Sequence, residues 1–353
     1  MLAYCGHSRS SLRIMIRLII RQLQKLLMTG VVALLALPAS AGCQMQNLVE
    51  MPVTADQGKL LTEGLINGNS ARMLIDTGAD ASLVWKPAIE RLGLRLINAP
   101  GRPKRVYGLG GESQEGSAFV EEFRVAAITM TNHRFAVAGD WDGGMDFILA
   151  EDLLSKTSIE FDLRHHAVRT MDLTGCTVEQ LPYWATTYSM ADLVASPRDA
   201  LAIRINVLVN GRSVLAQLDS GSSVSILSKS LTDSLKAHYV STVVPVVGLG
   251  RGSLETWIAD VQTFTVGDET IKNTQLLVAE MGKYRTTLRA GSRIPVEIAG
   301  APELLLGLDF LRSHHVLVDN TLRKMVFTYE GGPVFETWRL TQSTAPAAAP
   351  AQP

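Results

Sequence analysis

The hydrophobic pattern predicts short strands, and one of them runs directly into an acidic residue. The apolar run that ends at Ile75 is followed by Asp76, and the apolar character resumes at Leu83. An apolar run bounded by turn residues is typical of a buried strand that ends in a tight loop. Because burying a single carboxylate is costly or raises its pKa, we expect Asp76 to have a structural partner.

A second copy of this pattern supplies that partner. The first loop reads Asp76-Thr77-Gly78-Ala79, and the second, 143 residues later, reads Asp219-Ser220-Gly221-Ser222. Six landmarks recur in the same order in both copies. They are an Asn-Gly turn, the Asp loop, a short helix, a glycine-rich tip, an apolar run and a final hairpin.

The repeat predicts an all-β fold of two homologous lobes related by a pseudo-twofold axis, with short helices. The predicted divisions are an N-terminal lobe at 59–173, a linker at 174–198, a C-terminal lobe at 199–332 and a disordered Ala/Pro tail at 343–353. The second copy carries extra residues around 283–298, which we expect to form a loop.

Residues 1–43 have the pattern of an export signal. Basic side chains precede the apolar run 31–37, and small residues follow it. The run is shorter than the roughly 20 residues that a membrane span requires. Two alternatives remain for the end of this segment. Cleavage follows Ala41, or Cys43 becomes the lipidated first residue, since residues 40–43 resemble a bacterial lipoprotein signal. Without lipidation, Cys43 and Cys176 can form a single disulfide.

Composition and the remaining motifs exclude several functions. The 33 basic and 34 acidic side chains nearly balance, so the chain shows no basic footprint for nucleic acid. The glycines of 248–252 precede a predicted strand, whereas a dinucleotide-binding motif precedes a helix. The pairs His165-His166 and His314-His315 lack companion residues at metal-ligand spacing, and we expect surface histidines and no metal.

Two facing aspartates suggest a specific chemistry. Two carboxyl groups in contact share one proton, so one acts as a general base toward water while the other acts as an acid. Thr77 and Ser220 supply hydroxyls that can bond across to the opposite loop. Gly78 and Gly221 leave room for backbone N–H groups to approach the carboxylates. The two tips are expected to cover a bound peptide; they comprise Tyr107, Gly108, Leu109 and Gly110 in the first copy and Gly248, Leu249 and Gly250 in the second.

The chain resembles a retropepsin-like aspartic peptidase whose two lobes are fused in one polypeptide. The loop at Asp76 is similar to the retroviral motif, and that at Asp219 to the pepsin variant. Leu305-Leu306-Gly307 is similar to the family's apolar-apolar-glycine motif. In the first copy the motif reads Ile148-Leu149-Ala150, with alanine replacing glycine.

The resemblance implies an aspartic endopeptidase with Asp76 and Asp219 as its catalytic pair. It implies no cofactor, a peptide or protein substrate, and a monomer; together with the export signal it predicts a periplasmic protein, with lipid attachment at Cys43 as the alternative. A hydrogen bond from the Ser222 hydroxyl, which Ala79 cannot supply, is expected to keep Asp219 charged and leave the shared proton on Asp76. The rival hypothesis is a non-catalytic peptide-binding or scaffolding lipoprotein on the same fold.

Overall fold

The computed structural model describes residues 42–56, 58–97, 106–108, 111–113, 116–139, 143–154, 157–195, 202–247, 253–281, 286–288, 295–297 and 301–335. Residues 1–41 of the predicted export signal, Leu109, Gly110, Gly248, Leu249, Gly250 and the Ala/Pro tail therefore lie outside the described residues. Within the described part, no helix is both long and apolar enough to cross a membrane.

The first half of the fold is an eight-stranded sheet, in which the pairing of β3 with β9 adds to the linear order β2-β3-β4-β11-β5-β10-β9-β6. Its elements are β2 (Thr54–Asp56), β3 (Lys59–Ile66), β4 (Asn69–Ile75), β5 (Leu83–Trp85), α2 (Lys86–Arg91), β6 (Arg95–Ile97), β9 (Ser117–Val125), β10 (Ile128–Ala138), β11 (Phe147–Leu149) and α3 (Glu151–Leu154). The predicted first tip lies on a two-stranded hairpin formed by β7 (Val106–Gly108) and β8 (Gly111–Ser113).

The second half repeats this plan in a seven-stranded sheet of order β15-β16-β23-β17-β20-β19-β18, with β15 also paired to β19. Its elements are β15 (Arg204–Val209), β16 (Arg212–Leu218), β17 (Ile226–Ser228), α4 (Lys229–Leu235), β18 (Tyr239–Val247), β19 (Ser253–Val266), β20 (Glu269–Ala279), β23 (Leu304–Leu306) and α5 (Leu308–Ser313). The segment expected to be a loop contains a short strand pair, β21 (Thr286–Leu288) with β22 (Pro295–Glu297).

The predicted Asn-Gly turns are present and have the same backbone conformation in both halves. Asn67 and Asn210 both adopt positive φ angles, near 50°, as type I′ hairpin turns require. Each asparagine side chain also accepts two backbone N–H groups of the neighbouring strand, at 2.9–3.0 Å for Asn67 and 2.9–3.1 Å for Asn210. The amide side chain therefore ties each turn to its sheet.

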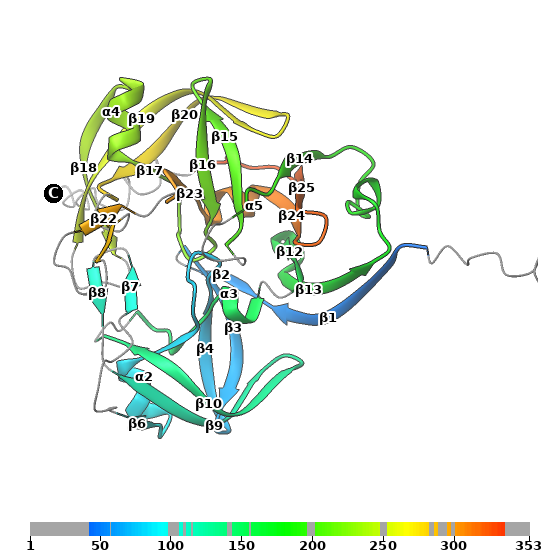
Figure 1. The fold of residues 1–353 in the computed structure, drawn as a ribbon, viewed down its shortest axis with the longest axis vertical. Coiled ribbons are helices and arrows are strands. Elements are labelled where there is room, and N and C mark those ends of the chain that lie inside the picture. Colours follow the sequence, from blue (N-terminus) through cyan, green and yellow to red (C-terminus); the bar gives the residue numbers. More distant parts are fainter. Residues whose placement is uncertain are drawn as a thin grey trace, which may run out of the picture. The chain divides into compact units, whose positions relative to one another are not determined.

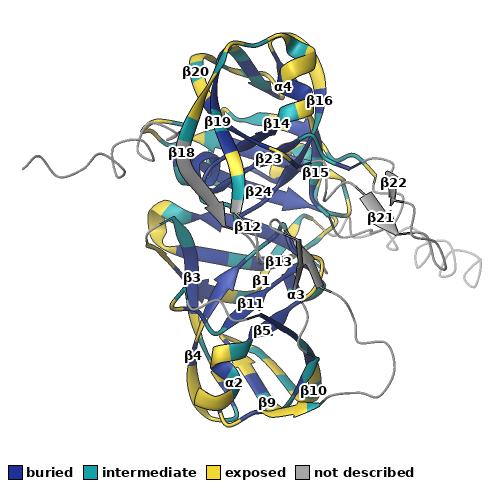
Figure 2. Ribbon diagram, turned by 90° about the vertical axis from the view of Figure 1, so that its left-hand side faces the viewer, coloured by how far each residue is buried: buried dark blue, intermediate teal, exposed yellow. Residues whose placement is uncertain are grey.

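A six-stranded sheet joins the halves, and it lies between the other two sheets in both Figure 1 and Figure 2. The closing hairpins of the two copies meet in it through the antiparallel pairing of β12 with β24. The order is β1-β13-β12-β24-β25-β14. The strands are β1 (Gln44–Pro52), β12 (Ser158–Asp162), β13 (Ala167–Thr174), β14 (Ser189–Asp192), β24 (His314–Asp319) and β25 (Lys324–Tyr329), with short 3₁₀ helices at η1 (Leu163–His165) and η2 (Val178–Gln180).

Two of these six strands were not predicted. β1 precedes the predicted first lobe, and β14 lies within the predicted linker. Both form the edges of the joining sheet, where half of each strand's backbone hydrogen-bonding capacity is unused and side chains are largely exposed. The main hydrophobic core contains side chains from both halves and from the joining sheet, which Figure 2 shows as the dark buried interior.

The structure favours the disulfide alternative over lipidation at Cys43. Its sulfur is bonded to that of Cys176 in a disulfide that spans 133 residues and fixes the start of β1 to the end of β13. One sulfur cannot carry both a disulfide and a thioether-linked lipid, so the disulfide alternative is the one that the structure supports.

Candidate active site

Equivalent strand pairs deliver the two aspartates. β4 runs parallel to β11 and ends at Asp76, whose N–H donates to Leu149 O at 2.9 Å. β16 runs parallel to β23 and ends at Asp219, whose N–H donates to Leu306 O at 2.9 Å. The buried apolar strands thus fix the backbone of both loops, as their hydrophobic sequences predict.

A serine and an aspartate brace each loop from behind, and sequence reasoning missed both pairs. Ser82 Oγ donates to Asp152 at 2.6 Å and accepts the Ala150 N–H at 3.0 Å. In the second half Ser225 Oγ donates to Asp309 at 2.7 Å and accepts the Gly307 N–H at 2.9 Å. The repeat itself carried the signal, since each serine lies six residues after its loop aspartate, and Asp152 and Asp309 each lie two residues after the apolar motif.

Thr77 and Ser220 interlock the two loops. The Thr77 N–H donates to Ser220 Oγ at 3.1 Å, and the Ser220 N–H donates to Thr77 Oγ1 at 3.1 Å. Each hydroxyl then donates to a carbonyl of the opposite strand, Thr77 to Leu218 at 2.9 Å and Ser220 to Ile75 at 2.8 Å. The hydroxyl bonds across the loops that the sequence predicts are therefore present, and both side chains are fully buried.

Each carboxyl group lies against the glycine of the opposite loop. A methyl group at Gly78 would lie 2.6 Å from Asp219 Oδ2, and one at Gly221 would lie 2.6 Å from Asp76 Oδ2. Each of these glycines also donates its N–H to the aspartate of its own loop, at 2.8 Å for Gly78 and 3.0 Å for Gly221. Glycine is required here because the two loops approach too closely for any side chain.

Burial raises the pKa of both carboxyl groups, and that of Asp76 is raised further. The charge of Asp219 and a hydrogen bond between the two carboxyl groups add to the increase at Asp76. At Asp219 the Ser222 and Gly221 N–H groups and the bond from Asp76 oppose the effect of burial. The two carboxyl groups therefore titrate as a pair that shares one proton.

The expected role of the Ser222 hydroxyl at Asp219 is wrong. Ser222 Oγ donates to Val224 O at 2.8 Å, and only the Ser222 backbone N–H reaches Asp219, at 3.0 Å. A serine hydroxyl readily donates such a local hydrogen bond to the backbone carbonyl of a residue close to it in the chain. The larger rise in the pKa of Asp76 arises from burial and from the contact between the two carboxyl groups.

The alanine that replaces glycine in the first half marks a packing difference. A methyl group at Gly307 would lie 2.5 Å from Val224 O, so the second half requires glycine there. Ala150 is fully buried and packs with Leu83 and Ile148. The backbone behind Asp76 therefore leaves space that the backbone behind Asp219 does not.

Two small apolar clusters, separate from the main core, flank the loops. Leu83 lies opposite Ile148 across β5 and β11, and Ile226 lies opposite Leu305 across β17 and β23. The second cluster includes Leu254, which pairs with Val246 near the base of the second tip. The cluster members are Leu61, Leu74, Ala79, Leu83, Trp85, Ala138, Met145, Ile148 and Ala150 in the first half, and Val224, Ile226, Ile258, Leu277, Ala279, Met281 and Leu305 in the second.

The histidines divide between surface and core. His165 and His166 are exposed, as expected, but the surface prediction is wrong for His314 and His315, which are 1% and 4% exposed. Both are held by hydrogen bonds, His314 to Phe310 O and His315 to Glu160. Among the described residues, no three His, Cys, Asp or Glu side chains are grouped so that they could hold a metal ion.

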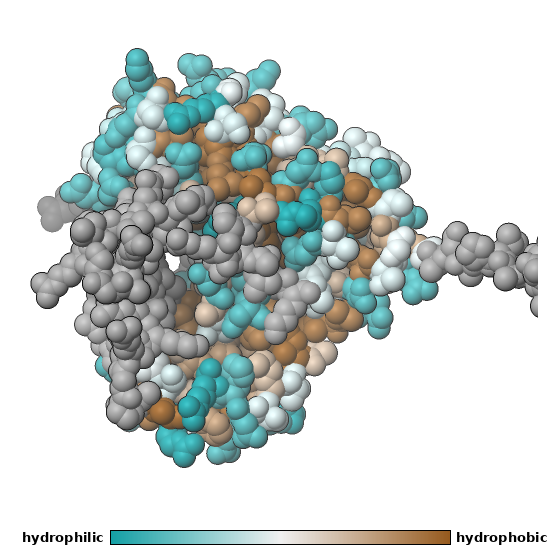
Figure 3. Space-filling view, viewed as in Figure 1, coloured by the Kyte–Doolittle hydropathy of each residue, from teal (hydrophilic) through white to brown (hydrophobic). Residues whose placement is uncertain are grey.

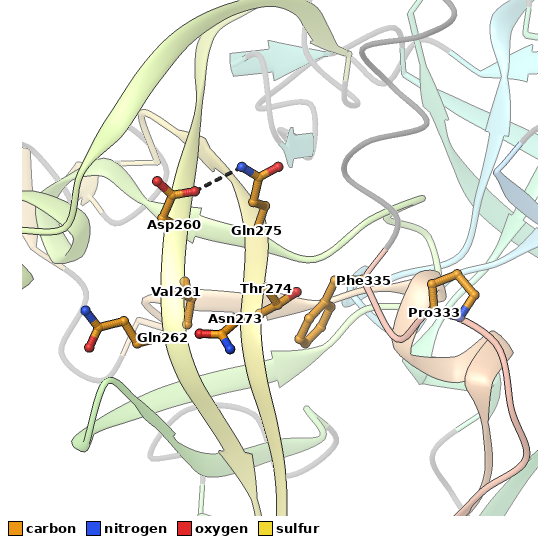
Figure 4. Close-up of a pocket in the computed structure, with 8 residues that line it drawn as sticks. All are labelled: Asp260, Val261, Gln262, Asn273, Thr274, Gln275, Pro333 and Phe335. Carbon is orange, nitrogen blue, oxygen red and sulfur yellow. Dashed lines mark hydrogen bonds between the residues drawn. The ribbon is translucent and has the colours of Figure 1, made fainter.

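Two surface cavities lie away from the two aspartates. One of about 540 Å³ lies over β19 and β20, where Gln275 donates to Asp260 at 2.9 Å and Phe335 closes one end (Figure 4). A second cavity, of about 630 Å³, lies between β14 and the second half. On the face shown in Figure 3, hydrophobic residues are more frequent near the middle of the described surface than at its upper and lower ends.

Two homologous β-lobes that bring two Asp-[Thr/Ser]-Gly loops into contact define the acid protease fold. The chain belongs to the aspartyl protease family, whose model matches residues 62–152 and 205–310, more than half of the chain. The aspartic proteinase from Irpex lacteus is similar over 81% of this chain and 97% of that one, at 12% identity and a TM-score of 0.46. No curated protein matches the sequence.

Proposed function

We propose that the chain is an aspartic endopeptidase that hydrolyses peptide bonds with a water molecule activated between Asp76 and Asp219. The observation that carries the proposal is the contact between the two carboxyl groups, each seated on the opposite loop's glycine. Thr77 and Ser220 hold that arrangement from both sides. Family membership supports peptide chemistry at this site.

The different environments of the two carboxyl groups suggest which of them accepts a proton and which donates one. Asp219, held charged by two backbone N–H groups, accepts a proton from the water as its oxygen attacks the peptide carbonyl carbon. Asp76, which holds the shared proton, donates it to the carbonyl oxygen. Collapse of the tetrahedral intermediate then breaks the C–N bond as Asp219 gives its proton to the leaving nitrogen, and a hydroxyl of the intermediate returns a proton to Asp76, which restores the pair.

The substrate we propose is an extended peptide or an unfolded protein segment. The two apolar clusters beside the loops suit apolar side chains on either side of the cleaved bond. The β7–β8 hairpin, which carries Tyr107 and Gly108, is proposed to cover the peptide, together with the tip at Gly248, Leu249 and Gly250. Because one chain supplies both aspartates, a monomer suffices for this chemistry.

We propose that the protein is exported and works in the periplasm. The support is the basic and apolar pattern of residues 1–43 together with the Cys43–Cys176 disulfide, since disulfides persist in oxidising compartments.

The decisive test is digestion of a peptide library by wild type, Asp76→Asn and Asp219→Asn, with and without pepstatin. Each substitution removes one half of the proton relay and should reduce kcat/KM by about 10³-fold or more. Asp268→Asn, at an exposed turn between β19 and β20, is the matched control and should cleave like wild type. Binding of peptides without turnover by the wild type would instead support the non-catalytic alternative.

A further inference from the structure

Glu151 occupies in the first half the position that Leu308 occupies in the second. Each is the first residue of the short helix after the apolar strand. Each donates its N–H to the third residue after the loop aspartate, Glu151 to Ala79 O at 3.1 Å and Leu308 to Ser222 O at 2.8 Å. The first half thus has a carboxylic acid at the position where the second half has a leucine.

The Glu151 side chain is buried, and its carboxyl oxygens lack a well-formed hydrogen bond. Glu151 is 1% exposed and Leu308 is fully buried. Neither carboxyl oxygen of Glu151 makes a hydrogen bond of normal geometry in the described structure. A buried, unpaired carboxylate is far less stable than the neutral acid, so this environment favours the protonated side chain.

Charged groups of both halves surround this acid. Asp76 and Asp80 face it from the first loop, and Arg204 and the Ile203 backbone face it from the beginning of the second half. Burial raises the pKa of Glu151 to about 8; the two aspartates add to the increase, while the Ile203 backbone and Arg204 oppose it. The group therefore lies where the Asp76 loop meets the second half.

We propose that Glu151 is a proton-binding site that couples the docking of the two halves to pH. The protonated side chain occupies a buried site beside the Asp76 loop. Loss of the proton places a negative charge there, next to Asp76 and Asp80 and only partly balanced by Arg204, and weakens the junction. The inference concerns the folded protein itself and does not depend on the proposed hydrolysis.

The sign of the effect follows from proton linkage. The unfolded chain releases this proton near the ordinary glutamate pKa of 4.5, while the folded chain keeps it to about 8. Between these values the folded state holds one more proton than the unfolded state. The equilibrium constant for unfolding therefore rises about tenfold per pH unit from this group, and the stabilisation is complete only below pH 4.5.

Two variants test the proposal by denaturant unfolding at several pH values from 5 to 8. Glu151→Gln keeps the shape of the neutral acid, and Glu151→Leu copies Leu308. Both should lose this contribution, so the wild-type unfolding constant should rise by about 400-fold more than theirs across the three units. Glu90→Gln, an exposed glutamate on α2, is the control and should keep the wild-type slope. An unchanged slope in both Glu151 variants, or an equal stability change at every pH, would overturn the proposal.

A second measurement keeps the proposal testable if a variant fails to fold. NMR titration of the full chain labelled only in glutamate carboxyl carbons separates Glu151 from the two active-site aspartates. One glutamate resonance should stay protonated to near neutral pH and be missing from Glu151→Gln. A spectrum in which all glutamates of the folded chain titrate in the ordinary acidic range would contradict the assignment. Neither readout requires peptidase activity, so failure here is separate from failure of the proposed function.

Discussion

His315 donates a hydrogen bond to Glu160 at 2.8 Å across β12 and β24, the strand pair that joins the two halves. Glu160 is completely buried and also accepts bonds from Tyr183 at 2.6 Å and from Arg169 at 3.0 Å. Trp184 stacks on the His315 ring, with centroids 3.8 Å apart. A single carboxylate thus connects the first half, the segment between the halves and the second half.

Removing this carboxylate should weaken the junction between the two halves and lower the stability of the fold. Glu160→Leu removes the acceptor of the His315 and Tyr183 hydrogen bonds and one of the three acidic partners of Arg169, so we expect a loss of about 3 kcal/mol in the free energy of unfolding. Glu160→Gln keeps the shape and should lose less. Denaturant unfolding at neutral pH measures both, with the exposed Glu121→Gln as the control.

The pH dependence of that loss has a sign opposite to that of Glu151. Burial alone raises the pKa of Glu160, but the bonds from His315, Tyr183 and Arg169 outweigh it and lower the pKa below 4.5. Its stabilisation is therefore present above pH 4.5 and is lost as the pH falls through the lower value in the folded state. The stability difference between wild type and Glu160→Gln should shrink in acid, and a difference that stays constant would contradict this account.

The hydrogen bonds between Thr77 and Ser220 predict that substitutions at Thr77 differ in effect according to whether they keep the hydroxyl. Thr77→Val removes the hydroxyl that bonds to Leu218 and Ser220, leaves two buried polar groups unsatisfied and should cost about 2 kcal/mol. Thr77→Ser keeps the hydroxyl and serves as the matched control. We expect Thr77→Val to reduce kcat more than it raises KM, because the carboxyl groups lose their alignment, and kinetics on one cleaved peptide would measure this. Equal activity of the two variants would show that the interlock does not position the pair.

Internal repetition explains why so much of this fold was predictable. The strand patterns, the Asn-Gly turns and the two Asp loops each occur twice, and a twofold arrangement of similar halves brings the loops of Asp76 and Asp219 together. The predicted closing hairpins, at β12–β13 and β24–β25, are also present. What the sequence did not indicate is that these hairpins pair with each other.

The features that were missed depend on contacts between distant residues. Glu160 and His315 look like surface residues in the sequence, and the pairing of β12 with β24 buries them together. Glu151 is equally ordinary in sequence, because its environment is set by Arg204 and Asp80, which are distant along the chain. The edge strands β1 and β14 have few buried side chains, so their hydrophobic pattern is weak.

The disulfide should contribute measurably to stability. It closes a loop of 133 residues and fixes β1, an edge strand that otherwise depends on its pairing with β13. Cys43→Ser with Cys176→Ser should lower the free energy of unfolding by about 2–5 kcal/mol. Adding a reductant to the wild type should have a similar effect and should leave the double variant unchanged. A reductant that lowers the stability of the double variant as well would show that the loss has another source.

The unequal apolar motifs predict unequal effects of exchanging glycine and alanine between the halves. Gly307→Ala places a methyl group 2.5 Å from Val224 O and 2.9 Å from Ser225 N, so the loop of Asp219 must shift. We expect a loss of about 2 kcal/mol and reduced activity, because overpacking a buried site forces the backbone to move. Ala150→Gly removes a methyl that already fits, and should cost about 1 kcal/mol with activity retained. Thermal unfolding and peptide cleavage of the two variants make the comparison, and equal effects would mean that the two halves pack alike behind their aspartates.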